Sequence, residues 1–120
     1  MKRFIPLIII GALLISGTHI IHTAQASEKT VEVFFNEACK DCGELVKETY
    51  PALFGEYGYK LELHDYINER SNRTLLTQAN ETWGVPFELQ SHIEAFLDDR
   101  LLIGGHVPEQ TIRTLLEHPD

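Results

Sequence analysis

The residues with the clearest chemistry are Cys39 and Cys42, the two cysteines of the chain, which enclose Lys40 and Asp41. An apolar segment (31–35) precedes them and an amphipathic one (43–50) follows, which predicts a strand, a tight turn and a helix beginning under Cys39. A helix N-terminus carries unpaired N–H groups and partial positive charge. A thiol placed there has a pKa lowered from about 8.5 to roughly 3.5–7.5. The pattern therefore predicts that Cys39 is a nucleophile and that Cys42, one helical turn later, resolves a mixed disulfide.

Three other roles for this pair remain open. A purely structural disulfide would close a very short loop, and the stabilisation from loop closure grows with loop length. Half of a zinc site would need a second Cys or His pair at matching spacing, and the sequence has none. The pair could also be inert. A redox-active dithiol is the prediction that the spacing favours, with a metal-ligand pair as the alternative.

The N-terminal segment 1–26 has the pattern of a secretory signal peptide. Lys2 and Arg3 precede an apolar run, and Ala24-Gln25-Ala26 supplies a small-residue cleavage motif. Cleavage would leave Ser27 first. The alternative is an uncleaved membrane anchor, since the apolar span is only slightly short for a bilayer. We expect an exported protein, periplasmic or otherwise extracytoplasmic, that contacts a membrane only if this segment is retained.

Residues 27–120 are expected to form one small domain. The net charge of the whole chain is −8, and loss of Lys2 and Arg3 would make it −10. Such an acidic surface argues against nucleic acid as a partner and against anionic lipid. Outside the cytosol the cysteines would meet an oxidising environment. We expect a monomer whose partners are protein dithiols or disulfides, or a redox partner.

The hydrophobic pattern predicts the order β-α-β-α-β-β-α. The strands are expected at 30–35, 59–66, 92–97 and 101–103, with the last two joined as a hairpin through a turn at 98–100. The first helix begins near Asp41 and is kinked or ended near Tyr50 by Pro51. The second is capped by Asn68 or Ser71 and ends before Gly84. Pro108 opens the last helix. The expected fold is α/β, a four-stranded mixed sheet with helices on both faces and a right-handed crossover between the first two strands.

A C-x-x-C between the first strand and first helix of this order resembles the thioredoxin fold, and the run 34–39 resembles the approach to a thioredoxin active site. Val85-Pro86 resembles the family's cis-proline loop, which implies that these two residues bind the substrate backbone. The chain departs from thioredoxins at two places. Val33 stands where they carry a buried aspartate, and Ala38 replaces the tryptophan before the first cysteine. If the hairpin sets the alignment instead, Ile93 takes the place of the cis-proline.

The second half is similar to a narrower family, the small exported thioredoxin-like proteins associated with bacterial copper resistance. The resemblance rests on Gly84-Val85-Pro86, on Leu89, Ser91 and His92, and on Gly105-His106-Val107-Pro108 followed by an apolar helix. That family carries C-x-C-C and a further cysteine beside the Ser-His stretch. Here Asp41 replaces the middle cysteine and none lies near Ser91, so the soft ligands for copper(I) are halved.

Two functions follow as hypotheses. The first is an exported thiol–disulfide oxidoreductase that uses Cys39 and Cys42 and needs no cofactor or metal. The alternative is a periplasmic copper(I)-binding protein that uses the same cysteines with His92 or His106. A third possibility is an interaction domain with an idle dithiol. The remaining histidines of the domain, His64 and His118, are expected to be solvated, and Trp83 is expected to pack against the core rather than bind substrate.

Overall fold

The computed structural model describes residues 27–119; the predicted signal peptide at 1–26 and the last residue lie outside this range. The strands are β1 (Lys29–Phe35), β2 (Tyr59–Asp65), β3 (Ile93–Leu97) and β4 (Leu101–Gly104). The helical segments are α1 (Lys40–Glu44), the π-helix η1 (Leu45–Thr49), α2 (Tyr50–Glu56), α3 (Arg70–Trp83), the 3-10 turn η2 (Phe87–Leu89) and α4 (Glu109–Glu117).

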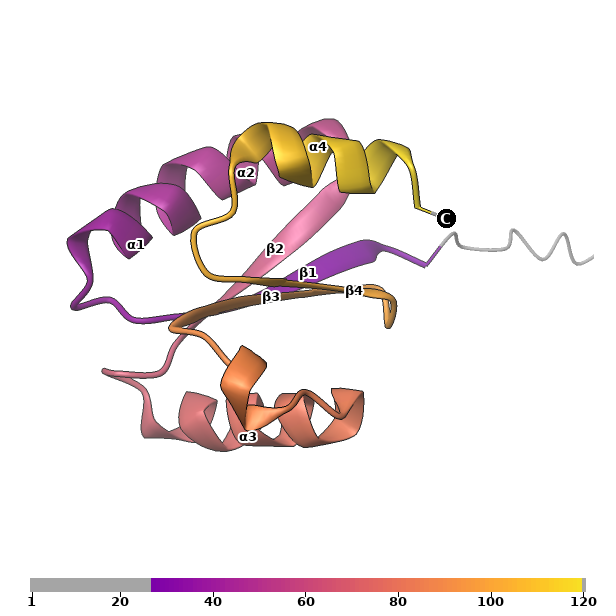
Figure 1. Ribbon diagram of the computed structural model, residues 1–120. Coiled ribbons are helices and arrows are strands. Elements are labelled where there is room, and N and C mark those ends of the chain that lie inside the picture. The colour runs from indigo at the N-terminus through magenta and orange to yellow at the C-terminus, as the bar shows by residue number, and fades with distance from the viewer. Residues whose placement is uncertain (1–26, 120) are drawn as a thin grey trace, which may run out of the picture.

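The four strands form one mixed sheet in the order β2-β1-β3-β4. β1 is parallel to β2, whereas β3 is antiparallel to both β1 and β4. Helices α1, α2 and α4 lie on one face of the sheet and α3 lies on the other (Figure 1). The predicted α/β class, element order and hairpin are confirmed, and the architecture is compatible with a thioredoxin-like fold.

Alternation along β1 divides its side chains between two apolar layers. Val31, Val33 and Phe35 are buried in the larger core cluster, which also contains Cys42 and Tyr50. Residues of opposite parity face α3, because successive side chains of a strand point to opposite faces. In that smaller layer, Phe34 and Trp83 each pack edge-to-face on Phe96. The prediction that Trp83 packs against the core is confirmed. The dithiol therefore belongs to the larger core.

The first helix does not end at Pro51. The helical run continues from Lys40 to Glu56, with a π segment immediately before Tyr50. Proline cannot donate a hydrogen bond to the carbonyl four residues earlier, and its ring clashes with that turn. The wider π turn accommodates this defect, and Pro51 then occupies the first turn of α2, where a missing N–H costs nothing.

The predicted cap of α3 is wrong. Its N-cap is Glu69, and neither Asn68 nor Ser71 caps the helix. The carboxylate of Asp65, the last residue of β2, instead accepts hydrogen bonds from the backbone N–H of Ile67 at 2.9 Å and from the side chain of Asn68. Asp65 thus organises the whole connection, which local sequence signals for a helix start did not indicate.

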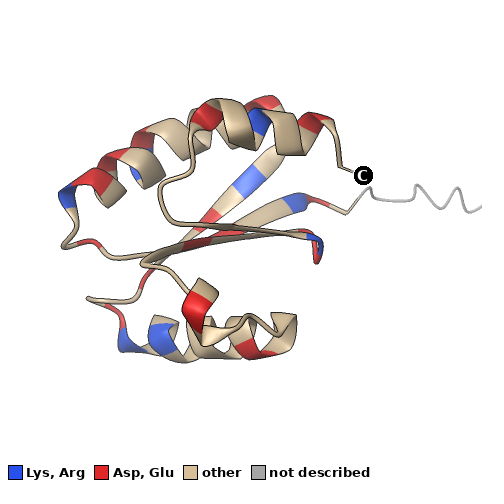
Figure 2. Ribbon diagram, viewed as in Figure 1, with Lys and Arg blue, Asp and Glu red and all other residues tan. Residues whose placement is uncertain are grey.

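Acidic segments are spread over the helices above the sheet and over the α3 layer (Figure 2). Arg113 on α4 bonds Glu56 on α2 and Glu109 on its own helix, which fastens α4 to α2. Its hydrogen bonds hold the pKa of Glu56 below its ordinary value. Between residues 27 and 119 no helix has the length and apolarity needed to cross a membrane.

Candidate functional site: a dithiol facing two histidines

Cys39 and Cys42 form a disulfide at the start of the first helix, with their Cα atoms 5.2 Å apart. Cys39 is the N-cap residue of α1, and its carbonyl accepts the N–H of Gly43 at 3.2 Å. Cys39 is partly exposed, whereas Cys42 has no exposed surface. The accessible sulfur is therefore at the position predicted for the nucleophile, and the buried one at the position predicted for the resolver.

Two histidines distant in sequence converge on this disulfide. His106 Nε2 lies 3.8 Å from Cys42 Sγ and 3.0 Å from His92 Nε2. One donor atom from each of Cys39, Cys42, His92 and His106 lies within 4.8 Å of the others. The structure thus brings together all four residues named for the metal-binding alternative. Both histidines are exposed, so the cluster is open to solvent on their side.

Two hydrogen bonds to the backbone hold the segment that carries His92. The hydroxyl of Tyr66, just after β2, donates to the His92 carbonyl at 2.9 Å. The N–H of the preceding Ser91 donates to Glu94 Oε1 at 2.7 Å. Glu94 is 1% exposed, and its other oxygen accepts the amide of Asn80 on α3 at 2.8 Å. A carboxylate buried behind the loop therefore fixes the segment that carries His92.

His106 is positioned by the left-handed residue that precedes it. Gly105 has a φ of +77°, a conformation that side-chain-bearing residues rarely adopt. Its N–H donates to the Ile93 carbonyl at 2.8 Å, which joins the end of β4 to the start of β3. A Cβ at this position would lie 3.4 Å from Ser91 Oγ. The close approach of the two loops is what places His106 beside His92.

Val85 and Pro86, the predicted substrate loop, do not join this cluster. Val85 N–H donates to the Asn80 carbonyl and Gly84 N–H to the Glu81 carbonyl, which is a Schellman motif closing α3. The described residues contain no cis peptide bond, so the resemblance of Val85-Pro86 to a cis-proline loop does not extend to the peptide bond before Pro86. The sequence Gly-Val-Pro is compatible both with the end of a helix and with a cis-proline loop. In this structure the residue before β3 that faces the dithiol is His92. A substrate-binding role for Val85 and Pro86 stays a prediction.

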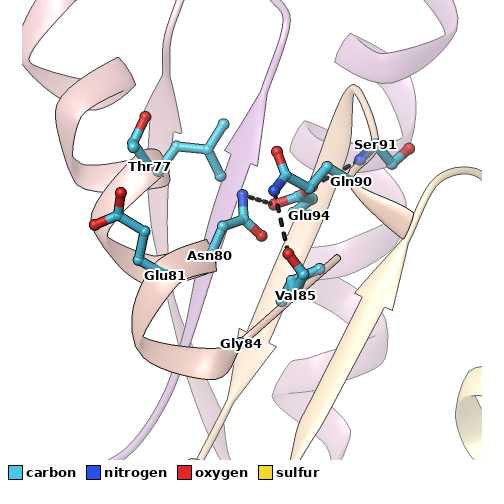
Figure 3. Close-up of a pocket in the computed structure, with 9 residues that line it drawn as sticks. Thr77, Asn80, Glu81, Gly84, Val85, Gln90, Ser91 and Glu94 are labelled. Carbon is cyan, nitrogen blue, oxygen red and sulfur yellow. Dashed lines mark hydrogen bonds between the residues drawn. The ribbon is translucent and has the colours of Figure 1, made fainter. Parts of the chain in front are cut away.

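Val85 instead lines a cavity of about 320 Å³ between α3 and the start of β3, together with Asn80, Glu81, Gln90 and Glu94 (Figure 3). Gln90 donates its side-chain amide to the Val85 carbonyl at 3.2 Å. The cavity contains none of the four cluster residues. Its polar side is formed in part by Asn80 and Glu94, which also hold the segment that carries His92.

Tyr66 and Glu94 hold the segment that carries His92, and neither residue was predicted to do so from the sequence. Glu94 offered a signal, because it is the one charged residue in the otherwise apolar strand Ile93–Leu97, and all five of these residues are buried. A buried carboxylate needs hydrogen-bond partners. Tyr66 offered no signal, since its role depends on the segment after β2 reaching the residue before β3 in space.

Comparison with known proteins adds one distant likeness. No protein-family model matches the chain, and a search of curated proteins finds no match. Among solved structures, one described as copper resistance protein CopG, form 1, aligns with a TM-score of 0.49 at 22% identity. The alignment covers 76% of this chain and 62% of that protein, so this chain spans less than two thirds of its length.

The chemistry of the cluster depends on the redox state of the sulfurs. In the disulfide the two sulfur atoms are bonded to each other and neither is a thiolate. After reduction, two thiolates and two imidazoles would face one another, and thiolate is the form of cysteine that binds metals and attacks disulfides. The same four residues can therefore hold a soft metal ion or perform disulfide exchange.

Proposed function

We propose that the reduced protein binds copper(I) through Cys39, Cys42, His92 and His106. The observation that carries the proposal is the approach of one donor atom from each residue to within 4.8 Å of the other three. Thiolate sulfur is a soft ligand that selects copper(I), and imidazole also suits copper. Zinc accepts the same four donors in tetrahedral sites, so zinc is the competing ion.

The exposure of the four residues fits a metal that is loaded and released. Cys42 is fully buried and shields one side from water, whereas the two histidines are exposed and leave a path from solvent. Oxidation to the disulfide removes two of the four donors. Binding is therefore coupled to reduction, and oxidation would release the ion.

The test is a titration of the reduced protein with copper(I) against a chromophoric copper(I) chelator under anaerobic conditions. We expect one copper per chain, and Cys39→Ser should abolish binding. His92→Ala and His106→Ala should each weaken it at least tenfold, which is about 1.4 kcal/mol. His118→Ala, in the exposed C-terminal segment, is the matched control and should bind as wild type. Copper binding that is indifferent to both cluster histidines, or preference for zinc over copper(I), would refute the proposal.

Thiol–disulfide exchange at the same dithiol is the second candidate, and the unequal exposure of the two cysteines favours it. The Cys39 thiolate would attack a substrate disulfide, break its S–S bond and release one substrate thiolate. The Cys42 thiolate would then attack Cys39, release the second substrate thiolate and form the Cys39–Cys42 disulfide, so that two electrons pass to the substrate. His106, 3.8 Å from Cys42, is placed to accept the Cys42 proton, which Val33 cannot do.

Single cysteine variants test this second function. Cys42→Ser should accumulate mixed disulfides with a model disulfide substrate, because the accessible Cys39 attacks and nothing resolves the product. Cys39→Ser should accumulate few, because Cys42 is buried. Intact-mass analysis after acid quenching measures both. Equal trapping by the two variants would contradict the assigned roles.

One experiment separates the two candidates: alkylation of Cys39 in the reduced protein between pH 4 and 9, with and without one equivalent of copper(I). Full protection by copper supports the metal site. A thiolate that forms well below pH 8 and is unaffected by copper supports the oxidoreductase. An ordinary thiol without protection contradicts both.

The cellular location, oligomeric state and partners are proposed to be the same for either function. We propose an exported, periplasmic monomer in which residues 1–26 act as the signal, with protein dithiols, disulfides or a redox partner as reaction partners. The acidic net charge supports the exclusion of nucleic acid. Fractionation of cells expressing the full chain tests the location.

A further inference from the structure

Glu32, Glu62 and His64 form a second cluster on the face of the sheet that carries α3. We propose that these three side chains bind a divalent transition-metal ion of the zinc(II) type. One carboxylate oxygen from each glutamate and one ring nitrogen of His64 lie within 4.8 Å of one another. None of the three belongs to the dithiol site, so this proposal stands independently of the copper(I) proposal.

The register of the sheet is what joins the two carboxylates. In the parallel pair β1–β2, Glu32 lies opposite Glu62 and Phe34 lies opposite His64. Residues directly opposite on one face interact most strongly, and like charges there are destabilising. Among the ion pairs of residues 27–119, Glu62 has no cationic partner, and Glu32 is paired only with His64. A cation bound between the carboxylates of Glu32 and Glu62 would replace their mutual repulsion with attraction to the ion.

His64 is held in place for such a role. Its ring stacks on Phe34 with centroids 4.7 Å apart and planes at 21°. The side chain is only 18% exposed, which corrects the prediction that His64 is solvated. Its Nε2 atom is buried, has no hydrogen-bond partner and lies 3.7 Å from Glu32 Oε1. Buried nitrogens are normally hydrogen-bonded, so a buried nitrogen without a hydrogen bond beside two carboxylates is suited to bind a metal ion.

The surface beside the cluster favours cations. Glu32 and Glu62 lie in a groove whose other lining residues are Glu28, Thr30, Trp83, Phe96, Asp98 and Asp99. No lysine or arginine lines it, although Lys60 lies 3.7 Å from Glu28 at its border. A concave surface with charges of one sign concentrates ions of the other.

The donor set selects the class of ion. Carboxylate with imidazole suits zinc(II) and the other first-row divalent ions, whereas copper(I) prefers the thiolates at the first site. Three protein ligands leave a fourth tetrahedral position for water, the arrangement of open zinc sites. The protein would thus have two metal sites of different chemistry, a soft site at the dithiol and a harder site at Glu32, Glu62 and His64.

The test uses the full chain without an affinity tag, oxidised so that the Cys39–Cys42 disulfide removes both thiolates of the first site. Zinc(II) is titrated by calorimetry, and the ring signals of His64 are followed by NMR. We expect one zinc per chain with a shift of the His64 signals. Even the loss of a group that only orients a ligand costs roughly tenfold or more in metal affinity, so loss of a direct ligand in His64→Gln or Glu62→Gln should weaken binding at least tenfold.

Glu88→Gln is the matched control, since it removes one exposed carboxylate of η2 and should leave zinc affinity within twofold of wild type. Absence of saturable zinc binding would overturn the proposal. So would equal affinity in His64→Gln and wild type, which is the result expected of carboxylates acting alone. Loss of zinc binding in His92→Ala with retention in His64→Gln would place the ion at the dithiol site and also overturn it.

Discussion

Tyr50 in the core shows how a single buried group makes stability depend on pH. The residue has no exposed surface, and its hydroxyl has no hydrogen-bond partner. Burial raises the pKa of Tyr50 from 10 to about 12, because the ionised form is poorly solvated inside the protein. Below pH 10 the group is protonated in both states. Between pH 10 and 12 the unfolded state loses its proton more readily, so stability falls as pH rises.

We therefore expect Tyr50→Phe to lose less stability than wild type between pH 10 and 12. At pH 7 the variant should equal wild type or gain about 1 kcal/mol, since it removes an unpaired buried hydroxyl. Denaturant unfolding at pH 7, 10 and 11 measures the difference between the two proteins, in which the other tyrosines cancel. An identical pH dependence of the two proteins would show that Tyr50 is not the group responsible.

Residue spacing predicted Cys39 and Cys42 as a reactive pair, and the resemblance to the copper-resistance family suggested His92 or His106 as their companions, but the supports of the cluster were not predicted. Cys39 and Cys42 were predictable because their chemistry depends on a local turn and helix start. Tyr66 acts through a hydrogen bond to the distant His92 carbonyl, and Glu94 acts as a buried link between Asn80 on α3 and the N–H of Ser91. His64 was wrongly predicted to be solvated, because its burial depends on the cross-strand neighbour Phe34 and not on its own sequence context.

Among the elements, the connection between β4 and α4 controls the geometry of the site. Gly105→Ala would force a side chain into a left-handed conformation, which costs about 1–2 kcal/mol. It would also crowd Ser91 Oγ, 3.4 Å from the new Cβ. We expect loss of stability in that range and weaker copper(I) binding, because His106 moves away from His92. Chemical denaturation and the chelator competition measure the two effects.

Gly55→Ala provides the control for that substitution. Gly55 lies in α2, and a Cβ there would meet nothing within 4 Å. Alanine in a helix is favoured over glycine by roughly 0.5–1 kcal/mol, so this variant should be as stable as wild type or more so, with unchanged copper binding. If Gly105→Ala behaved in the same way, the left-handed turn would not be what positions His106.

At the scale of the whole molecule, the redox state should decide whether copper stabilises the fold. A ligand that binds only the native state at 100 times its Kd adds about 2.7 kcal/mol to the free energy of unfolding. We expect a rise of this size for the reduced protein with copper(I) and none for the oxidised protein, whose sulfurs are bonded to each other. Anaerobic thermal unfolding of both forms tests this, and equal stabilisation of the two would show that the thiolates are not ligands.

The sequence by itself determined the α/β class, the order of strands and helices, and the helix-start position of the two cysteines. These features depend on hydrophobic period and on turn and helix-end residues, which act over a few neighbours. It did not determine that a π turn would accommodate Pro51 within a continuous helical run, or that the N–H of Val85 would help to close α3. Each of these outcomes depends on how a segment packs.

Only the tertiary structure decided which distant side chains meet. His92 and His106 reach the dithiol because β3 and β4 pair in one register and Gly105 bonds Ile93 across them. Glu32 and His64 meet because β1 and β2 pair in parallel with Glu32 opposite Glu62. A shift of one residue in either register would turn these side chains to the opposite face of the sheet. Strand register is set by long-range packing, which is why neither site follows from local sequence.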